Sequence, residues 1–209
     1  MYNYADTHEK SLKFVNFAFE MERVDIDIQK ACDVLRRGGL ILYPTDTVWG
    51  IGCDAFNSEA VRKVFELKRR ADSKALIVLV GNERQLLSTV DDVPDVALQL
   101  IEASDRPVTI VYDHAVGVAP EVMAADGSVA VRLTSEPVSK RLCRMLRRPL
   151  VSTSANISGT PAPSVFAEIS PEILNGVDYV MEQGRDYPPS KPSIIIRISS
   201  DSSFKIIRD

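Results

Sequence analysis

Short apolar runs alternate with amphipathic helical segments along this chain, and this alternation constrains the fold more than any other feature of the sequence. The apolar runs at residues 40–43, 75–80, 108–112 and 129–133 are short and rich in Val, Ile and Leu, as buried strands are. Helical patterns separate these runs in the first part of the chain. Later strands are predicted at residues 150–152, 177–180, 194–198 and 204–207. This order predicts a three-layer α/β domain with a mixed sheet.

The predicted helices are amphipathic and have recognisable ends. The first begins at Asp25 or Asp27, either of which can cap it, and stops at Gly38 and Gly39. The second begins at Asn57 or Ser58. Its inward face is predicted to hold Ala60, Val61, Val64 and Leu67. Further helices are predicted at residues 82–87, 94–103 and 137–147.

The chain has 209 residues, enough for one domain with a sizeable core. Residues 1–20 have a weak pattern and are predicted to be a peripheral extension, followed by a single domain over residues 21–209. No secretory signal and no apolar run approaching the ~20 residues of a membrane helix is visible. Three widely spaced cysteines and two histidines predict no protein-ligated metal, and a reduced, cytoplasmic protein is expected.

Charge is distributed unevenly. The net charge of −4 argues against a protein that coats nucleic acid nonspecifically. Two basic islands stand out, residues 62–74 with a net charge of +4 and residues 140–148 with +5. They indicate either a local anionic ligand or solvated helix ends, where Lys and Arg are favoured by the helix dipole; charge alone favours the second interpretation.

Two short motifs have competing interpretations. Residues 50–55 match a loose GxGxxA dinucleotide fingerprint, but Pro44 and two threonines separate the first glycine from the preceding strand, where that fingerprint needs a tight turn. The spacing favours the interpretation that these glycines allow the backbone to pass close to a ligand or another strand. The run Ser152-Thr153-Ser154 follows a strand, but without a GxSxG elbow, and turn chemistry is favoured over a serine nucleophile.

Four segments in order resemble the YrdC-type threonylcarbamoyl-AMP synthases. The resemblance covers about residues 25–208 and rests on fairly specific motifs at its two ends. The segments are Tyr43-Pro44-Thr45-Asp46-Thr47-Val48-Trp49-Gly50-Ile51-Gly52, then Lys68-Arg69-Arg70 with Ser73-Lys74, then Val129-Ala130-Val131-Arg132, then Ser152-Thr153-Ser154-Ala155-Asn156-Ile157-Ser158-Gly159. The resemblance implies a YrdC-like open, twisted, mixed α/β sheet flanked by helices, with a concave, positively charged cleft.

The family's activity is implied in the same way. Its members combine L-threonine, bicarbonate and ATP into threonylcarbamoyl-AMP and pyrophosphate, with Mg²⁺ expected on the ATP phosphates. The product serves the threonylcarbamoyl modification of an adenosine beside the anticodon of certain tRNAs, so downstream tRNA threonylcarbamoyl-transfer proteins are expected partners. Because reactants that carry several negative charges must meet, positive charge and orientation matter more here than a strong base.

The resemblance also implies site residues. The threonine pocket is expected to comprise Thr47, Arg132, Ser152 and Ser193. The ATP site is expected to comprise Arg70, Lys74, Ser128, Ser154, Asn156 and Arg208. Lys68, expected at the phosphates, and Arg70 are the candidate catalytic residues, and their charges and the guanidinium fork suit phosphate and carboxylate.

Four positions depart from the family pattern. Leu79 stands where some members have a histidine, and Thr134 where many have a proline. Arg106 replaces a glycine, and Ile194 stands where threonine is common. Two alternatives stay open. The same basic cleft could hold tRNA or double-stranded RNA in a module without catalysis, and the departures at Leu79 and Arg106 leave open a paralogue that acts on another amine.

Overall fold

A computed structural model describes residues 4–70, 76–189, 191–199 and 203–209, with side chains described from residue 20 onward. The elements run in chain order as follows: α1 (Tyr4–Arg36), β1 (Ile41–Tyr43), β2 (Gly50–Gly52), α2 (Ser58–Lys68), β3 (Ile77–Val80), α3 (Glu83–Leu87), α4 (Asp95–Ala103), β4 (Val108–Tyr112), β5 (Val129–Leu133), α5 (Pro137–Leu146), β6 (Leu150–Ser154), α6 (Pro171–Gly176), β7 (Tyr179–Val180), β8 (Ile194–Ile198) and β9 (Phe204–Arg208). Short 3₁₀ turns lie at Pro120–Val122 and Phe166–Glu168.

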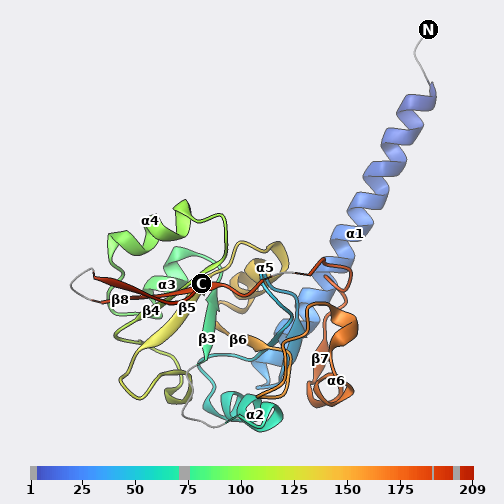
Figure 1. The fold of residues 1–209 in the computed structure, drawn as a ribbon. Helices are drawn as coiled ribbons and strands as arrows, with labels where there is room; N and C mark the ends of the chain where they lie inside the picture. Colours follow the sequence, from blue (N-terminus) through green and yellow to red (C-terminus); the bar gives the residue numbers. More distant parts are fainter. Residues whose placement is uncertain (1–3, 71–75, 190, 200–202) are drawn as a thin grey trace.

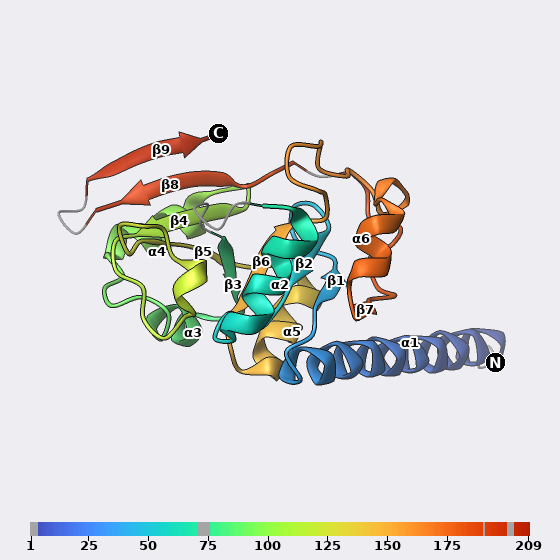
Figure 2. The ribbon, with the colours of Figure 1, turned by 90° about the horizontal axis from the view of Figure 1, so that it is seen from below.

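The described strands form one mixed sheet of nine, in the order β7-β1-β2-β6-β3-β5-β4-β8-β9. Parallel pairs join β3 to β5 and β4 to β8, whereas β6 runs antiparallel to both β2 and β3. The β8–β9 hairpin lies at one end of the molecule and α1 at the other (Figures 1 and 2). This mixed α/β sheet flanked by helices confirms the predicted fold class.

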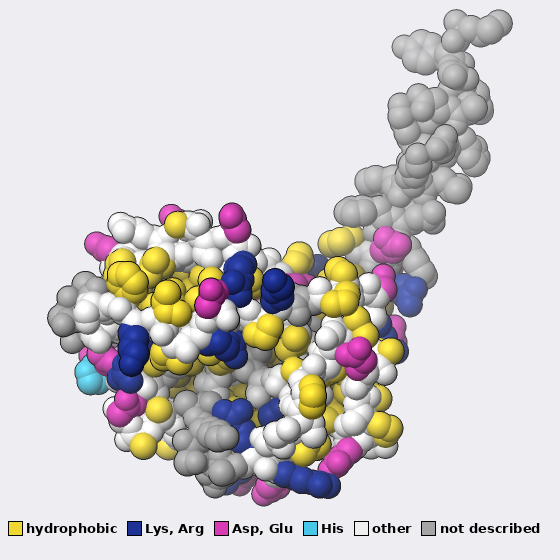
Figure 3. Space-filling view, in the orientation of Figure 1, with side chains coloured by type: hydrophobic (Ala, Val, Ile, Leu, Met, Phe, Trp, Pro, Cys, Tyr) yellow, Lys and Arg dark blue, Asp and Glu magenta, His cyan; other side chains and the backbone are white. Residues whose placement is uncertain are grey.

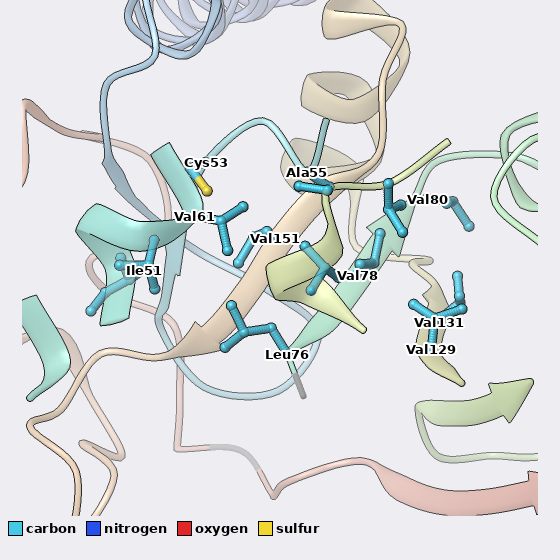
Figure 4. Close-up of a cluster of buried hydrophobic side chains, with 14 of the residues drawn as sticks. Ile51, Cys53, Ala55, Val61, Leu76, Val78, Val80, Val129, Val131 and Val151 are labelled. Carbon is cyan, nitrogen blue, oxygen red and sulfur yellow. The ribbon is translucent and has the colours of Figure 1, made fainter. Parts of the chain in front are cut away.

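Two separate cores cover the two faces of the sheet. The larger core packs strand residues such as Ile51, Val78 and Val131 against α2, α3, α4 and α6. Figure 4 shows these strand residues together with Val61 of α2. The smaller core lies on the other face and packs Ile41, Tyr43, Leu79 and Leu150 against α1 and α5. On this second face the described helices cover only one end of the sheet.

Helix α1 begins much earlier than predicted. It starts at Tyr4 rather than at Asp25 or Asp27, and its first half extends beyond the rest of the molecule (Figure 1). Asp27 accepts hydrogen bonds from the Tyr179 hydroxyl at 2.6 Å and from the backbone N–H groups of Glu182 and Gln183. Its carboxylate thus holds α1 against the segment after β7 instead of capping a helix. None of the described helices is long and apolar enough to cross a membrane.

Strand β2 was not predicted, because two of its three residues are glycines, which are poor strand formers. A Cβ at Gly52 would lie 2.7 Å from Cε1 of Tyr43 and 3.0 Å from the carbonyl oxygen of Val151. Only glycine therefore lets β2 fit between its neighbours, as the close-approach interpretation expects. The segment is a strand, so the dinucleotide fingerprint has no structural basis here. Helix α6 was also missed, although Ser170 caps it and Pro171 opens it.

Deletion of residues 1–20 is expected to change the free energy of unfolding by less than ~1 kcal/mol. The first fully buried apolar residue described on α1 is Ile28, followed by Ala31, Cys32 and Leu35. Urea unfolding of the full chain and of the truncated chain would measure the difference. A control deletion of residues 1–30 removes Ile28 and should cost several times more, and loss of cooperative unfolding after the shorter deletion would contradict the prediction.

Candidate active site

A cavity of about 390 Å³ opens on the sheet face that α1 and α5 leave uncovered. Seven of the residues expected at the site line it: Thr47, Arg70, Arg132, Ser152, Ser154, Ser193 and Arg208. Among the described residues no carboxylate lines this cavity. Figure 3 shows Lys and Arg side chains gathered around the hollow in the middle of this face. The cavity thus combines three guanidinium groups with short hydroxyl groups, which suits an anionic ligand.

The sheet register explains why these side chains meet. Ile77 of β3 pairs with Ala130 of β5 and with Ser152 of β6, and all three residues line the cavity. The neighbouring row pairs Leu79 with Arg132 and Leu150. Since Leu79 and Leu150 are fully buried beneath α1 and α5, Arg132 marks the boundary between the covered and open parts of this face.

Arg132 is only 3% exposed and is held by an acidic partner. Its Nε lies 3.0 Å from Oδ1 of Asp46, and its Nη2 donates to Oγ1 of Thr47 at 3.3 Å. A buried guanidinium needs such partners because desolvation of an unpaired charge is costly. The pair therefore holds Arg132 and Thr47 together at one wall of the cavity.

Arg208 reaches the cavity from the last strand and contacts Ser193. Its Nε and Nη2 donate to the carbonyl oxygen of Ser193 at 3.2 and 2.8 Å, and Nη2 lies 3.3 Å from the Ser193 hydroxyl. Burial, and to a smaller degree the charge of Arg132, lower the pKa of Arg208. Two cations at close quarters in a partly desolvated wall favour the binding of an anion between them.

Arg70 enters the cavity because of the way α2 ends. Arg69 has a left-handed backbone with φ of 50°, and the N–H of Arg70 donates to the Phe65 carbonyl at 2.9 Å. The chain therefore turns sharply, and Arg70 lines the cavity half-buried instead of pointing into solvent. Burial lowers the pKa of its guanidinium.

Lys68 does not line the cavity, and its side chain is only 2% exposed. Its Nζ donates to the carbonyl oxygens of Ser154 and, at 2.7 Å, of Asn156. Its own carbonyl accepts from the Ser158 N–H at 2.8 Å. Burial, reinforced by the charge of Arg70, lowers the pKa of Lys68 from 10.5 to about 8. Lys68 therefore holds the loop after β6 against the end of α2.

The other three expected ATP-site residues do not join this group. Ser128 is buried, and its hydroxyl and N–H donate to Asp126 at 2.6 and 3.1 Å. Asn156 donates to the carbonyl oxygens of Ile157 and Thr160 and lines a separate cavity beside α6. Lys74 lies outside the described residues.

The four departures from the family pattern also lie away from the cavity lining. Leu79 is buried beneath α5, and Arg106 pairs with Asp209 at 2.7 Å. The backbone N–H of Thr134 donates to Val80 at 3.0 Å, a bond that proline could not make. Ile194 pairs with Val108 in the sheet. These positions do not change the groups that a ligand in the cavity would meet.

Much of the charge in the two basic islands is engaged in ion pairs. In residues 140–148, Arg141 pairs with Asp25, and Arg148 pairs with Asp54 at 2.7 Å. In residues 62–74, Arg62 pairs with Glu121 and Arg69 with Glu172. Of the described residues in both islands, Arg70 alone lines the cavity. The helix-end interpretation therefore fits residues 140–148 better than an anion site does.

Within the described residues, no group of three or more His, Cys, Asp or Glu side chains could hold a metal ion. Cys32, Cys53 and Cys143 are all buried and unbridged. Burial raises the pKa of each thiol, Cys32 to about 11 and the other two further. None of the three has the lowered pKa of a cysteine nucleophile.

Comparison with known proteins gives consistent matches. The family model Sua5_yciO_yrdC, described as "Telomere recombination", matches residues 33–209. The threonylcarbamoyl-AMP synthase of Pseudomonas aeruginosa is 43% identical over 154 residues, which cover 73% of this chain and 83% of that protein. The threonylcarbamoyl-AMP synthase of Idiomarina loihiensis is 34% identical over 182 residues, or 86% of this chain and 97% of that protein.

Solved structures match as well. The crystal structure of P. abyssi Sua5 complexed with L-threonine gives a TM-score of 0.71 at 28% identity, over 82% of this chain. This chain spans 50% of the length of that protein. E. coli YciO gives a TM-score of 0.75 over 87% of this chain and 88% of that one, and at 23% identity this likeness shows the fold alone.

The buried ammonium of Lys68 should leave a signature in the pH dependence of stability. Because its folded pKa of about 8 is below the ordinary 10.5, the unfolded chain binds more protons in this window, and stability should rise with pH from 8 to 10.5. Relative to Lys68→Met, the wild-type chain should gain on the order of 2 kcal/mol across this window. Urea unfolding at both ends of the window measures it.

Lys63→Met is the matched control, because Lys63 lies on the exposed side of the same helix. It should keep the pH dependence of the wild type. Equal pH dependence in wild type and Lys68→Met would show that Lys68 is not a buried, charged group.

Proposed function

The chain belongs to the Sua5/YciO/YrdC family, and on this premise we propose that it combines L-threonine, bicarbonate and ATP into threonylcarbamoyl-AMP and pyrophosphate. The observation that carries the proposal is that Arg70, Arg132 and Arg208 line one cavity together with short hydroxyl groups. Three cations in a partly buried wall match reactants that carry carboxylate, bicarbonate and triphosphate charges.

The proposed reaction has two steps. The neutral amine of threonine attacks the carbon of bicarbonate, and a carbamate forms with loss of water; attack on carbon dioxide gives the same carbamate with loss of a proton. A carbamate oxygen then attacks the α-phosphorus of ATP, the bond to the β-phosphate oxygen breaks, and pyrophosphate leaves with the electron pair. Charge builds up on the phosphoryl oxygens and the leaving group, so guanidinium groups fixed beforehand in a cavity stabilise the transition state.

The residues divide between the two ligands. We assign the amino acid to Thr47, Arg132, Ser152 and Ser193, and the nucleotide to Arg70, Ser154 and Arg208, all of which line the cavity. Lys68 acts indirectly, since its ammonium holds the end of β6 that carries Ser154. Direct contacts of Lys74, Ser128 and Asn156 with ATP stay predictions from the family resemblance. Mg²⁺ is proposed to be held by the ATP phosphates, because Asp46 already faces Arg132.

The product is proposed to serve tRNA modification. Threonylcarbamoyl-AMP is a mixed anhydride, and its carbonyl carbon is activated for transfer to an amine. The proposed acceptor is the adenosine beside the anticodon of certain tRNAs, reached through separate threonylcarbamoyl-transfer proteins, and the proposed location is the cytoplasm. Within residues 140–148, Arg141 and Arg148 are paired within the chain, whereas Arg144 and Arg147 are exposed, so direct binding of RNA there stays an alternative.

Release of pyrophosphate tests the proposed function directly. It should require ATP, L-threonine and bicarbonate together, and omission of any one should reduce it to background. A panel of other amino acids in the same assay tests whether the chain acts on another amine. Pyrophosphate release that ignores threonine and bicarbonate would contradict the proposal.

Arg70→Ala should reduce turnover about a hundredfold, or ~3 kcal/mol of transition-state stabilisation, with little change in melting temperature. Arg70→Lys should restore activity only in part, because a point charge cannot reproduce the guanidinium fork. Threonine-dependent pyrophosphate release and thermal unfolding measure the two effects. Arg62→Ala, at an exposed arginine on α2, is the control and should keep full activity. Normal turnover of Arg70→Ala would refute the proposed nucleotide site.

A further inference from the structure

Two buried hydroxyl groups that do not line the cavity contact the hydroxyl groups that do. Thr45 Oγ1 lies 3.0 Å from Thr47 Oγ1, and Thr109 Oγ1 lies 2.8 Å from Ser193 Oγ. We propose that Thr45 and Thr109 are positioning residues that make Thr47 a hydrogen-bond acceptor and Ser193 a hydrogen-bond donor toward the amino-acid substrate. This inference rests on the proposed function and concerns how the same site orients its amino-acid substrate.

The bonds of Thr45 determine the polarity of Thr47. Thr45 Oγ1 donates to the Val48 carbonyl at 2.8 Å, so its single proton is used. The same oxygen accepts from the Thr47 N–H at 3.0 Å, and its remaining lone pair faces Thr47 Oγ1. Since Thr45 has no proton left to give, Thr47 must donate its own hydroxyl proton to Thr45.

Thr47 is then left with acceptor capacity alone. Its hydroxyl proton is directed to Thr45, and one of its two lone pairs accepts from Arg132 Nη2 at 3.3 Å. The remaining lone pair can accept a hydrogen bond from a ligand, because Thr47 lines the cavity. A ligand must therefore bring an N–H or O–H group to Thr47, because an anionic oxygen there would meet a lone pair.

Ser193 has the opposite polarity. Its hydroxyl oxygen faces Arg208 Nη2, which can only donate, and Thr109 Oγ1. Thr109 is fully buried, and among the described residues its hydroxyl is hydrogen-bonded to Ser193 alone. If Ser193 donated to Thr109, the Thr109 proton would be buried without an acceptor, which is costly.

Thr109 therefore donates to Ser193. With Arg208 and Thr109 filling both of its lone pairs, the Ser193 hydroxyl keeps its own proton for the cavity that it lines. This proton, next to the charge of Arg208, suits a carboxylate oxygen.

The two polarities orient an amino acid in the cavity. Its carboxylate lies on the Ser193 side, and an N–H or O–H group lies on the Thr47 side. The group at Thr47 is either the amine or the side-chain hydroxyl of threonine. An amino acid bound in the reverse direction would place its carboxylate against the Thr47 lone pair, so the pair of positioning residues selects one direction.

The Thr47 side is tested with Thr45→Val and its conservative partner Thr45→Ser. Thr45→Val frees the Thr47 hydroxyl to rotate and should raise KM for L-threonine about tenfold, whereas Thr45→Ser should restore it. KM for ATP should stay within about twofold of wild type in both variants. L-2-Aminobutyrate, which lacks the side-chain hydroxyl, identifies the group bound by Thr47. If Thr47 binds the hydroxyl, Thr45→Val should leave KM for L-2-aminobutyrate unchanged; if Thr47 binds the amine, this KM should rise as it does for threonine.

The Ser193 side is tested with Thr109→Val and Thr109→Ser. Thr109→Val should raise KM for L-threonine several-fold and leave KM for 1-aminopropan-2-ol, which is threonine without its carboxylate, within about twofold. Thr109→Ser should behave as wild type with both amines. Packing damage alone would affect the two amines equally, so an equal effect would overturn the role of Thr109.

The outcomes separate this inference from the proposed function. A wild-type chain without threonine-dependent pyrophosphate release would overturn both. Normal wild-type activity with unchanged KM for threonine in both valine variants would overturn the inference alone. Thermal unfolding is measured for every variant, and Thr45→Ala and Thr109→Ala replace a valine variant that fails to unfold as cooperatively as the wild type.

Discussion

One face of the sheet is larger than the area that α1 and α5 cover, and the site depends on this mismatch. The strand residues beneath the helices are apolar, whereas the cavity beyond them is lined by polar residues such as Arg132 and Ser152 as well as by apolar ones such as Ile77. Arg132 lies on that boundary, in the same row as Leu79 and Leu150. A charge at this place is stable only with a partner, and Asp46 supplies it. The Arg132–Asp46 pair thus closes the hydrophobic core and begins the polar cavity.

The cations around the cavity are held at a cost in free energy. Burial lowers the pKa values of Arg70, Arg208 and Lys68, so each charge is less stable in the fold than in water. Mutual repulsion adds to this cost, since Arg132 acts on Arg208 and Arg70 acts on Lys68. A polyanion that enters the cavity replaces part of the lost hydration and removes the repulsion. Binding of a polyanion therefore offsets part of the free-energy cost of burying these charges.

Local patterns were enough to predict most of the fold. The strands at residues 108–112, 129–133 and 194–198 were predicted with the bounds that the structure has, because β-branched runs between turn residues leave little ambiguity. The predicted start of α1 at Asp25 or Asp27 was wrong. Asp27 binds partners that are distant in sequence, and such contacts leave no local pattern. Strand β2 was not predicted for a related reason: Tyr43 and Val151 on the neighbouring strands leave no room for a Cβ at Gly52, and this constraint is not visible in the local sequence.

The site was predicted less completely than the fold. Motif resemblance assembled the seven residues that line the cavity, but it assigned Lys68 to the phosphates, and the structure buries that ammonium against backbone carbonyls. Helical periodicity does not distinguish the buried Lys68 from the cavity-lining Arg70, because one is the last residue of α2 and the other follows it by two positions. Thr45 and Thr109 carried no signal as single residues, and they became apparent only through the direction of their hydrogen bonds.

The three bonds made by Lys68 have a mechanical consequence. They join the end of α2 to the loop after β6 at Ser154, Asn156 and Ser158, so two segments that are distant along the chain form one unit. Arg70 extends from one part of this unit and Ser154 from the other. Neither can shift toward a ligand without carrying its counterpart along. The two segments of the cavity wall are therefore cross-linked by hydrogen bonds, so that a nucleotide meets Arg70 and Ser154 on one connected support.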